Sequence, residues 1–296
     1  MCFRSLTGCY VIAFGSLIIG FGYGMTNPAA SELLLRLVPV ERRNLIFSIK
    51  QTGVPIGGVL AGLTGPSISQ NFGWQSVPIV AAASCLILVL IMQPLRKKWD
   101  YKRDSTVRFS SKIFDSITIV LRSPPLVWLS ISGFFYAAVQ LCLATFVVTL
   151  LVTDVNFSLV EAGIVLAIIQ GSGAVGRIFW GWIADRLGHG ILVLLIMGAV
   201  CISSSFIVSA ITDNWQPLII YILFFFLGFN ALGWTGVFQV EAARYAPDGK
   251  LGAVIGGITA PSYGGVIFGP AAFSIVFFSI GSYTTTFLLV ALFALL

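Results

Sequence analysis

The chain has 296 residues, of which 57% are hydrophobic and 9% are charged, and its formal net charge is +6. Soluble globular proteins carry about 25% charged residues, so this composition excludes a water-soluble fold and predicts an integral membrane protein. The positive charge does not indicate nucleic-acid binding, because the basic residues lie in short gaps between long apolar runs.

Long apolar runs predict the membrane-spanning helices, because about 20 helical residues cross a hydrocarbon core about 30 Å thick. In chain order these runs are 10–37, 44–68, 77–95, 125–152, 160–184, 190–211, 217–240, 251–280 and 284–296. The last run is too short to cross, and we expect it to be cut off. None shows the alternating pattern of a barrel strand. The predicted fold class is therefore all-α and polytopic, with about nine spans.

Lysine and arginine lie in alternate connections between these spans. Apart from Arg4, all of them fall within 36–50, 96–122, 177–186 and 244–250, whereas 69–76, 153–159, 212–216 and 281–283 contain none. Cytoplasmic loops are enriched in Lys and Arg, so the basic side is predicted to be cytoplasmic.

This orientation gives a first testable prediction. A reporter fused within 96–123 should read cytoplasmic, and one within 153–159 should read extracytoplasmic, because the basic residues separate the two connections so completely. Reporters that place both segments on the same side would refute the span count.

The gap at 96–124 is the one sizeable polar segment. Within it Phe109, Ile113, Phe114, Ile117 and Leu121 recur at helical spacing. The pattern predicts a short amphipathic helix on the inner membrane surface.

The two ends of the chain repeat each other at an offset of 207 to 209 residues. Gly20-Phe21 maps onto Gly228-Phe229, Glu32 onto Glu241, Gly57-Gly58 onto Gly264-Gly265, and Gly73 onto Gly281. Three spans at each end match, and the three between them have no partner. A six-span unit used twice explains this if its first three spans are absent, and many transporters are built from such repeats. The expected organisation is a remainder of an N-terminal bundle at 1–95, a cytoplasmic linker at 96–124 and a C-terminal bundle at 125–296.

A signature follows the fifth predicted span, where residues 181–188 read Gly-Trp-Ile-Ala-Asp-Arg-Leu-Gly. This run resembles the second-half copy of the cytoplasmic motif G-x-x-x-D-R-x-G-[RK]-[RK] of the major facilitator superfamily. His189 and Gly190 replace the two usual basic residues, so a weaker cytoplasmic contact is expected. Segments 50–58 and 20–28 are similar to the family's fifth and fourth helices. The resemblance runs from the family's fourth helix to part of its twelfth, nine spans of an expected twelve.

The resemblance implies a cytoplasmic gating motif made of Gly181, Asp185, Arg186 and Gly188, together with Arg177 and Glu241. By the pseudo-symmetry of the two halves, Asp185 should lie near the N-terminal end of the second span, at 44–48. Arg186 or Arg177 should pair with Glu241. These contacts would favour a cytoplasm-closed state.

Polar residues within spans are the candidates for a substrate cavity: Tyr23, Asn27, Lys50, Gln51, Tyr136, Gln140, Gln170, Asn230 and Trp234. Charges inside a span are costly, so Lys50 and Arg177 favour an organic or inorganic anion. Lys50 reaching the headgroups and Arg177 pairing within the motif are the alternatives. Hydrogen bonds between helices explain the polar pairs equally well.

Three functions are open on these grounds. The first is secondary active transport of a small solute by alternating access, the second is a truncated remnant that does not transport, and the least favoured is a membrane-embedded lipid-modifying enzyme. Scattered carboxylates, the single His189 and five cysteines without CxxC spacing argue against an enzyme, a metal or a cofactor. The chain alone is not expected to transport, because the cavity needs both bundles.

The expected partners are a small-molecule substrate, with a coupling proton or ion, and the lipid bilayer. The protein is expected to be a monomer that binds no nucleic acid. The expected location is the cell membrane, as a multi-pass protein of a prokaryotic inner membrane.

Overall fold

A computed structural model describes residues 6–73, 75–96, 113–247 and 249–296, and these residues form helices without a β-strand among them. The helices are α1 (Leu6–Leu37), α2 (Arg43–Phe72), α3 (Ser76–Met92), α5 (Ile113–Leu121), α6 (Pro124–Thr153), α7 (Leu159–Leu187), α8 (Gly190–Ser209), α9 (Pro217–Ala231), α10 (Thr235–Arg244), α11 (Leu251–Ile280) and α12 (Tyr283–Leu295). In the described part of the chain, six segments are long and apolar enough to cross a membrane. The all-α membrane fold is confirmed, and the number nine stays a prediction.

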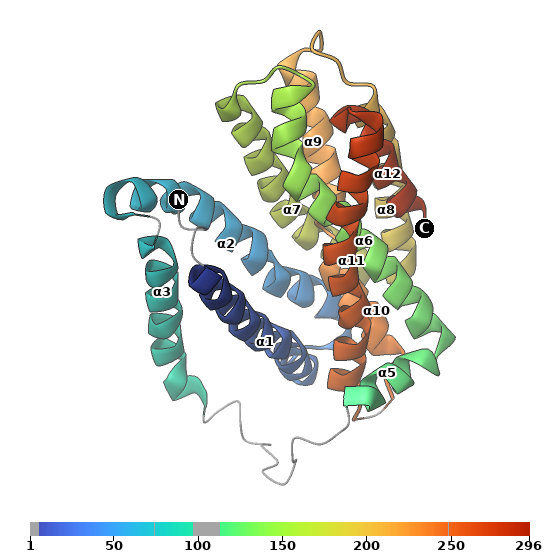
Figure 1. Cartoon of the computed structure of the whole chain (residues 1–296). Helices are drawn as coiled ribbons and strands as arrows, with labels where there is room; N and C mark the ends of the chain where they lie inside the picture. Colours follow the sequence, from blue (N-terminus) through green and yellow to red (C-terminus); the bar gives the residue numbers. More distant parts are fainter. Residues whose placement is uncertain (1–5, 74, 97–112, 248) are drawn as a thin grey trace.

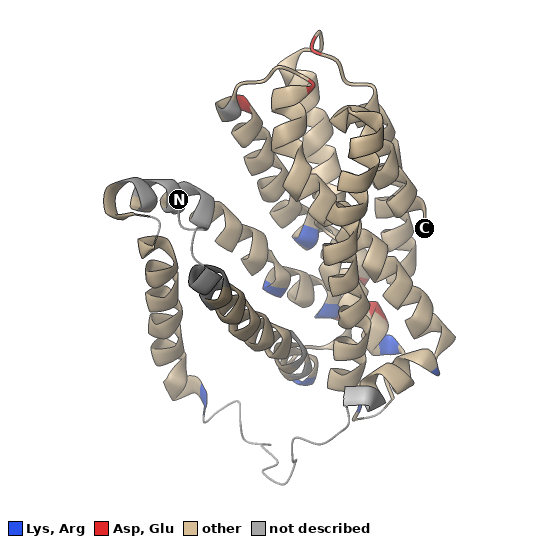
Figure 2. Cartoon of the chain, viewed as in Figure 1, with Lys and Arg blue, Asp and Glu red and all other residues tan. Residues whose placement is uncertain are grey.

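The helices form two groups (Figure 1). Helices α1, α2 and α3 lie together on one side, and α6 to α12 form a bundle on the other. The charges separate along the helices: Lys and Arg gather at the end where α2 begins and α7 ends (Figure 2). We call this the basic end, and we call the end that carries Asp154 and Asp213 the acidic end. This separation follows the charge alternation in the sequence.

The seventh predicted span, 217–240, is not one helix. It contains α9 and most of α10, with a break at 232–234: Ala231 ends α9, and Trp234 directly precedes α10. The Gly233 N–H donates to the Asn230 carbonyl, a tighter turn than that of an α-helix. No proline marks the break, which is why hydropathy alone predicts a continuous span.

Glycine allows the helices of the bundle to touch. A Cβ at Gly265 of α11 would lie 2.8 Å from the carbonyl carbon of Phe134 in α6, and one at Gly176 of α7 would lie 2.9 Å from that of Phe229 in α9. Lipid tails are as apolar as leucine, so helices in a membrane associate through such close packing rather than through the hydrophobic effect. These contacts fix the framework around the cavity described below.

Asp154 joins two helices at the acidic end. Its Oδ2 accepts hydrogen bonds from the Ser282 hydroxyl at 3.0 Å, the Thr284 N–H at 2.9 Å and the Thr284 hydroxyl at 3.1 Å. Burial alone would raise the pKa of Asp154, but these bonds and one from Thr153 outweigh it and lower that pKa. The carboxylate therefore stays charged at the N-terminus of α12, where the helix dipole favours a negative charge.

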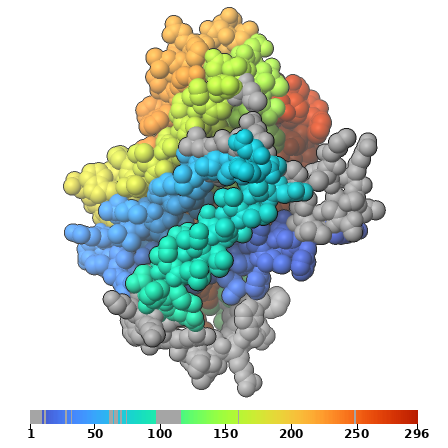
Figure 3. Space-filling view, turned by 90° about the vertical axis from the view of Figure 1, so that its left-hand side faces the viewer, coloured from blue at the N-terminus to red at the C-terminus, as the bar shows by residue number. Residues whose placement is uncertain are grey.

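The outer helices are less buried. No residue of α3 is buried, and Figure 3 shows this helix on the outer side of α1 and α2. In α5, Val120 is buried against α11, whereas Ile117 and Leu121 are exposed. Phe109 of the predicted amphipathic helix lies outside the described residues, as do the side chains of Ile113 and Phe114. The helix over 113–121 is present, and its membrane contact stays a prediction.

Candidate functional site

A cavity of about 270 Å³ lies between the two groups of helices. Tyr23 of α1 and Gln51 of α2 line it from one side, and residues of α6, α7, α10 and α11 line it from the other. Typical small-molecule sites have volumes of about 300 Å³ or more, so this cavity lies just below the lower end of that range and suits a small solute. Four predicted residues line it together: Tyr23, Gln51, Gln140 and Trp234.

Arg177 is the charged side chain among the described residues that line this cavity. It lies ten residues before the end of α7, about 15 Å along the helix and so deep within the span. The side chain is 2% exposed, and its Nε donates to the Leu232 carbonyl at 2.7 Å and its Nη1 to the Gln51 carbonyl. No carboxylate in the described ranges pairs with it. Neutral carbonyl dipoles thus replace the counter-ion that a buried cation normally has.

Aromatic rings line the same cavity as this cation. Tyr23 and Tyr263 meet edge to face with centroids 6.4 Å apart, and Trp234 meets Phe238 in the same way at 5.1 Å. The indole N–H of Trp234 donates to Gln140 Oε1 at 3.0 Å, which fixes both side chains. The cavity therefore combines apolar ring surfaces with one positive charge.

Lys50 lies behind the cavity wall rather than in it. Its Nζ donates to the Ser31 hydroxyl at 3.0 Å, and that hydroxyl donates to Gln239 Oε1 at 3.3 Å. Gln239 lines the cavity, so the chain of bonds connects α2, α1 and α10 to it. Lys50 adds to the positive potential without contacting the space.

The other predicted cavity residues lie elsewhere. Tyr136 stacks against Trp234 and donates its hydroxyl to the Leu194 carbonyl. Asn230 is buried and donates to the Phe226 carbonyl of its own helix at 2.8 Å. A Cβ at Gly58 of α2 would lie 3.5 Å from Gln170 Nε2. The side chain of Asn27 lies outside the described residues.

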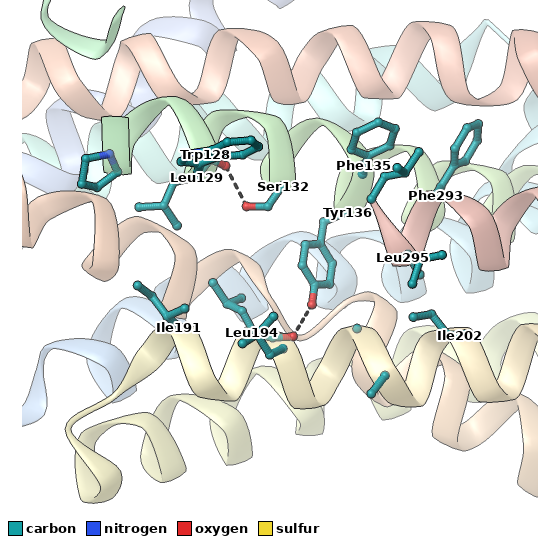
Figure 4. A pocket seen from close by; sticks show the side chains of 16 residues that line it. Trp128, Leu129, Ser132, Phe135, Tyr136, Ile191, Leu194, Ile202, Phe293 and Leu295 are labelled. Atoms are coloured by element: carbon teal, nitrogen blue, oxygen red, sulfur yellow. Dashed lines mark hydrogen bonds between the residues drawn. The ribbon is translucent and has the colours of Figure 1, made fainter. Parts of the chain in front are cut away.

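Tyr136 lines a second pocket, between α6, α8 and α12 (Figure 4). Leucine, isoleucine and phenylalanine form most of its wall. The hydroxyl of Ser132 donates to the Leu129 carbonyl at 2.9 Å, and that of Tyr136 also donates to a backbone carbonyl. Because both hydroxyls are used within the protein and no charged residue lines this pocket, it does not suit a charged solute.

Sequence reasoning missed the part of the cavity contributed by α10 and α11. Thr235, Gln239, Thr259, Ser262 and Tyr263 line it. The repeat contains the signal that could have found three of them: it maps Gln51 of α2 close to Thr259 of α11. The polar residues near Pro261 are therefore the counterparts in α11 of Lys50 and Gln51, the cavity residues predicted in α2.

At the basic end, Asp185 binds the N-terminus of α2. Its Oδ1 accepts from the Asn44 N–H at 3.0 Å and from Asn44 Nδ2 at 2.7 Å, and its Oδ2 accepts from the Leu45 N–H at 2.9 Å. Free N–H groups and the positive end of the dipole favour a carboxylate there. The contact predicted between Asp185 and 44–48 is present, and its role in gating stays a prediction.

Close packing continues this contact along α2. A Cβ at Gly181 of α7 would lie 2.7 Å from Ser48 Cβ, and a Cβ at Gly236 of α10 would lie 2.7 Å from Ser48 Cα. Ser48 is therefore enclosed by two glycines from the other group of helices. Any larger residue at Gly181 of the predicted motif would collide with Ser48, so close packing explains the glycine at this position.

The predicted pairing of Glu241 with Arg186 or Arg177 is wrong. Glu241 Oε1 lies 3.3 Å from Arg244 Nε and accepts from the Gly190 N–H at 3.1 Å. Arg186 instead lies over the ring of Trp182, 4.3 Å from its centroid. Arg177 is too deep in the span, and Arg244 is one helical turn from Glu241 and nearer.

Arg244 also connects the motif to this pair. Its Nη1 donates to the carbonyl of Gly188 at 2.9 Å. Gly188 ends α7 with φ 68°, a left-handed conformation that glycine adopts at low cost. Gly188 and Glu241, both predicted motif residues, thus meet through Arg244.

Comparison with known proteins gives the family. The model of the Major Facilitator Superfamily matches residues 1–256. The benzoate transport protein of Acinetobacter baylyi is 23% identical over 288 residues, which cover 81% of this chain and 60% of that protein. The probable anion transporter 5, chloroplastic, of Oryza sativa is 31% identical over 87 residues, 29% of this chain and 18% of that protein. The chain thus spans 60% or less of the length of these relatives.

Solved structures share the fold. A crystal structure of the E. coli fucose:proton symporter FucP matches with a TM-score of 0.70 at 14% identity, over 90% of this chain and 70% of that one. A structure of FucP described as outward in conformation matches with a TM-score of 0.68 at 13% identity, with the same coverage. At these identities the likeness shows the fold alone.

Proposed function

The chain belongs to the major facilitator superfamily, and from that premise we propose that it acts in secondary transport of a small anion by alternating access. Arg177 is the observation that carries the proposal. A guanidinium that is 2% exposed, faces a cavity and has only carbonyl partners among the described residues offers an anion a binding partner. A charge-assisted bond to a carboxylate or phosphate is about twice as strong as a neutral one.

The names of the relatives support an anion. One is called a benzoate transport protein and the other a probable anion transporter. Benzoate is an aromatic ring with a carboxylate, and this cavity offers rings of Tyr23, Trp234 and Tyr263 beside one cation. We propose an organic carboxylate of this size as the substrate class. No carboxylate lines the described part of the cavity, so the proposal rests on anion binding and not on proton coupling.

The contacts between the halves support alternating access. Those of α2 with α7 and α10 begin at the basic end, where Asn44 and Leu45 bind Asp185, and continue along α2 through Gln51 to Gly58. The repeat maps α1 onto α9 and α10, and α2 onto α11. Helix α1 contacts α11 while α2 contacts α10, and the Ser31–Gln239 bond joins two positions 208 residues apart, which is the offset of the repeat. Two repeats related by a pseudo-two-fold axis would make such reciprocal contacts. We propose that this state is closed at the basic end, on the cytoplasmic side.

Binding tests the proposal directly, and the purified chain is suitable because binding does not require the transport cycle. Labelled benzoate and inorganic phosphate are the probes. We expect benzoate to bind, benzyl alcohol not to compete, and Arg177→Gln to weaken the affinity about tenfold or more. Arg122→Gln, which removes an exposed charge that does not line the cavity, is the matched control and should bind normally.

Three results would contradict the proposal: no binding of benzoate, whether or not phosphate binds, equal competition by benzyl alcohol, or unchanged affinity in Arg177→Gln. A non-transporting remnant would still bind the anion, so reconstituted uptake would separate that alternative. The coarser membership in the family does not depend on this experiment.

A further inference from the structure

A proline explains why Arg177 reaches the backbone of α2. In an α-helix each carbonyl accepts from the N–H four residues later, and proline has no N–H. Pro55 lies four residues after Gln51 within α2, so the Gln51 carbonyl lacks its helical partner. Arg177 Nη1 donates to this carbonyl from α7, across the boundary between the two halves.

The second acceptor of Arg177, the Leu232 carbonyl, also lies at an interruption of a helix. Leu232 is the C-cap residue of α9, and the last carbonyls of a helix have no partner within it. Arg177 Nε donates to the Leu232 carbonyl at 2.7 Å. One guanidinium therefore binds two carbonyls that helix interruptions expose, and the two carbonyls belong to opposite halves of the molecule.

The Gln51 bond depends on the position of α2. Asn44 and Leu45, whose N–H groups bind Asp185, precede Gln51 on the same helix by about two turns. If α2 separates from α7 at the basic end, the Arg177–Gln51 bond breaks while the Leu232 bond, within the C-terminal bundle, can persist. A buried charged donor that loses its acceptor is costly, so Arg177 then needs another one.

We infer that Arg177 alternates between the Gln51 carbonyl and the transported anion, so that anion binding and the release of α2 from α7 are linked. The inference rests on the proposed function for the identity of the ligand as an anion. An anion that takes the guanidinium competes with Gln51 and favours the state in which α2 has moved. Because the two equilibria are linked, any change that weakens the contact between α2 and α7 must also increase the affinity for the anion.

A cysteine reporter on α2 tests this without a ligand. Thr52 is 6% exposed, so Thr52→Cys should react slowly with an impermeant maleimide added at the basic side. Cys2, Cys9 and Cys85 are replaced by serine, and the fully buried Cys142 and Cys201 remain. Pro55→Ala restores an N–H that competes for the Gln51 carbonyl, so we expect labelling about tenfold faster. Pro261→Ala removes a proline of α11 that lies four residues after Gly257, where α11 packs on α5 instead of α2, and it should not change the rate.

Arg177→Gln provides a second variant in case Pro55→Ala does not fold. It should also label faster than the wild-type chain, and adding benzoate should change nothing further. In the wild-type chain, benzoate should itself accelerate labelling, and in Pro55→Ala its Kd should fall.

Two results would overturn the inference. One is wild-type labelling rates in both Pro55→Ala and Arg177→Gln. The other is benzoate that binds the wild-type chain but leaves its labelling rate unchanged. Direct binding of labelled benzoate is measured separately, so a failure of the proposed function is recognised by absent binding, and a failure of this inference by labelling alone.

Discussion

Asp185→Asn should open the basic end. In the structure the carboxylate accepts from two backbone N–H groups of α2 and from Asn44 Nδ2, all within 3.0 Å. An amide presents one acceptor oxygen, and its NH₂ group would face N–H donors. Hydrogen bonds to a charged group contribute about 1.5–3 kcal/mol each, so losing one shifts a two-state population about tenfold or more.

The reporter for this prediction is Val240→Cys, because Val240 is 3% exposed in a cluster with Leu35 and Phe47 at the junction of α1, α2 and α10. Its labelling from the basic side should rise about tenfold or more in Asp185→Asn. Asp213→Asn, at the acidic end, removes the same charge and should leave the rate unchanged. Cys142 and Cys201 must stay unlabelled, since their reaction would indicate unfolding instead of opening. An unchanged rate at Val240→Cys would show that Asp185 does not keep the halves together.

Helix positions followed from the sequence because lipid and charge act on long segments. The predicted span 251–280 coincides with α11, and that at 125–152 lies within one residue of each end of α6. The break at 232–234 did not follow, since Gly233 and the tight turn at Asn230 change backbone geometry but not hydropathy. Hydropathy averages over a window, whereas a helix break depends on single hydrogen bonds.

The site was predictable where symmetry or local spacing determines it. The position of Asp185 followed from the repeat. For Arg177, an interaction with an anion was one of the two alternatives that the sequence left open. Its two acceptors could not be predicted, because they lie 126 and 55 residues away and are backbone atoms, which leave no side-chain signal. The pair of Glu241 and Arg244 could have been predicted from its spacing of three residues, whereas the predicted longer-range pair with Arg186 or Arg177 does not form. Tyr263 was not predicted, because hydropathy does not distinguish it from the other aromatic residues within the spans.

The departure from the family signature at 189–190 now has a structural reason. A Cβ at Gly190 would lie 2.7 Å from Glu241 Cγ and 2.8 Å from Cδ, so any side chain there would displace the carboxylate. The Gly190 N–H donates to that carboxylate at 3.1 Å, and Arg244 pairs with the same oxygen. His189, its neighbour, is exposed. We therefore expect position 189 to accept a basic side chain and position 190 not to accept one.

Gly190→Ala and Gly190→Lys should both destabilise the protein, although the lysine restores a residue typical of the family. Overpacking costs about 1–3 kcal/mol, and a buried carboxylate that loses its N–H donor costs a similar amount. We expect the midpoint of thermal unfolding to fall by about 5–10 °C. His189→Lys makes the equivalent change one residue earlier, at an exposed position, and should leave the midpoint within about 2 °C of the wild-type value, because surface substitutions cost about 0.5 kcal/mol or less. If Gly190→Lys were as stable as the wild-type chain, Glu241 would have to repack freely, and its contact with the N-terminus of α8 would not be what requires glycine here.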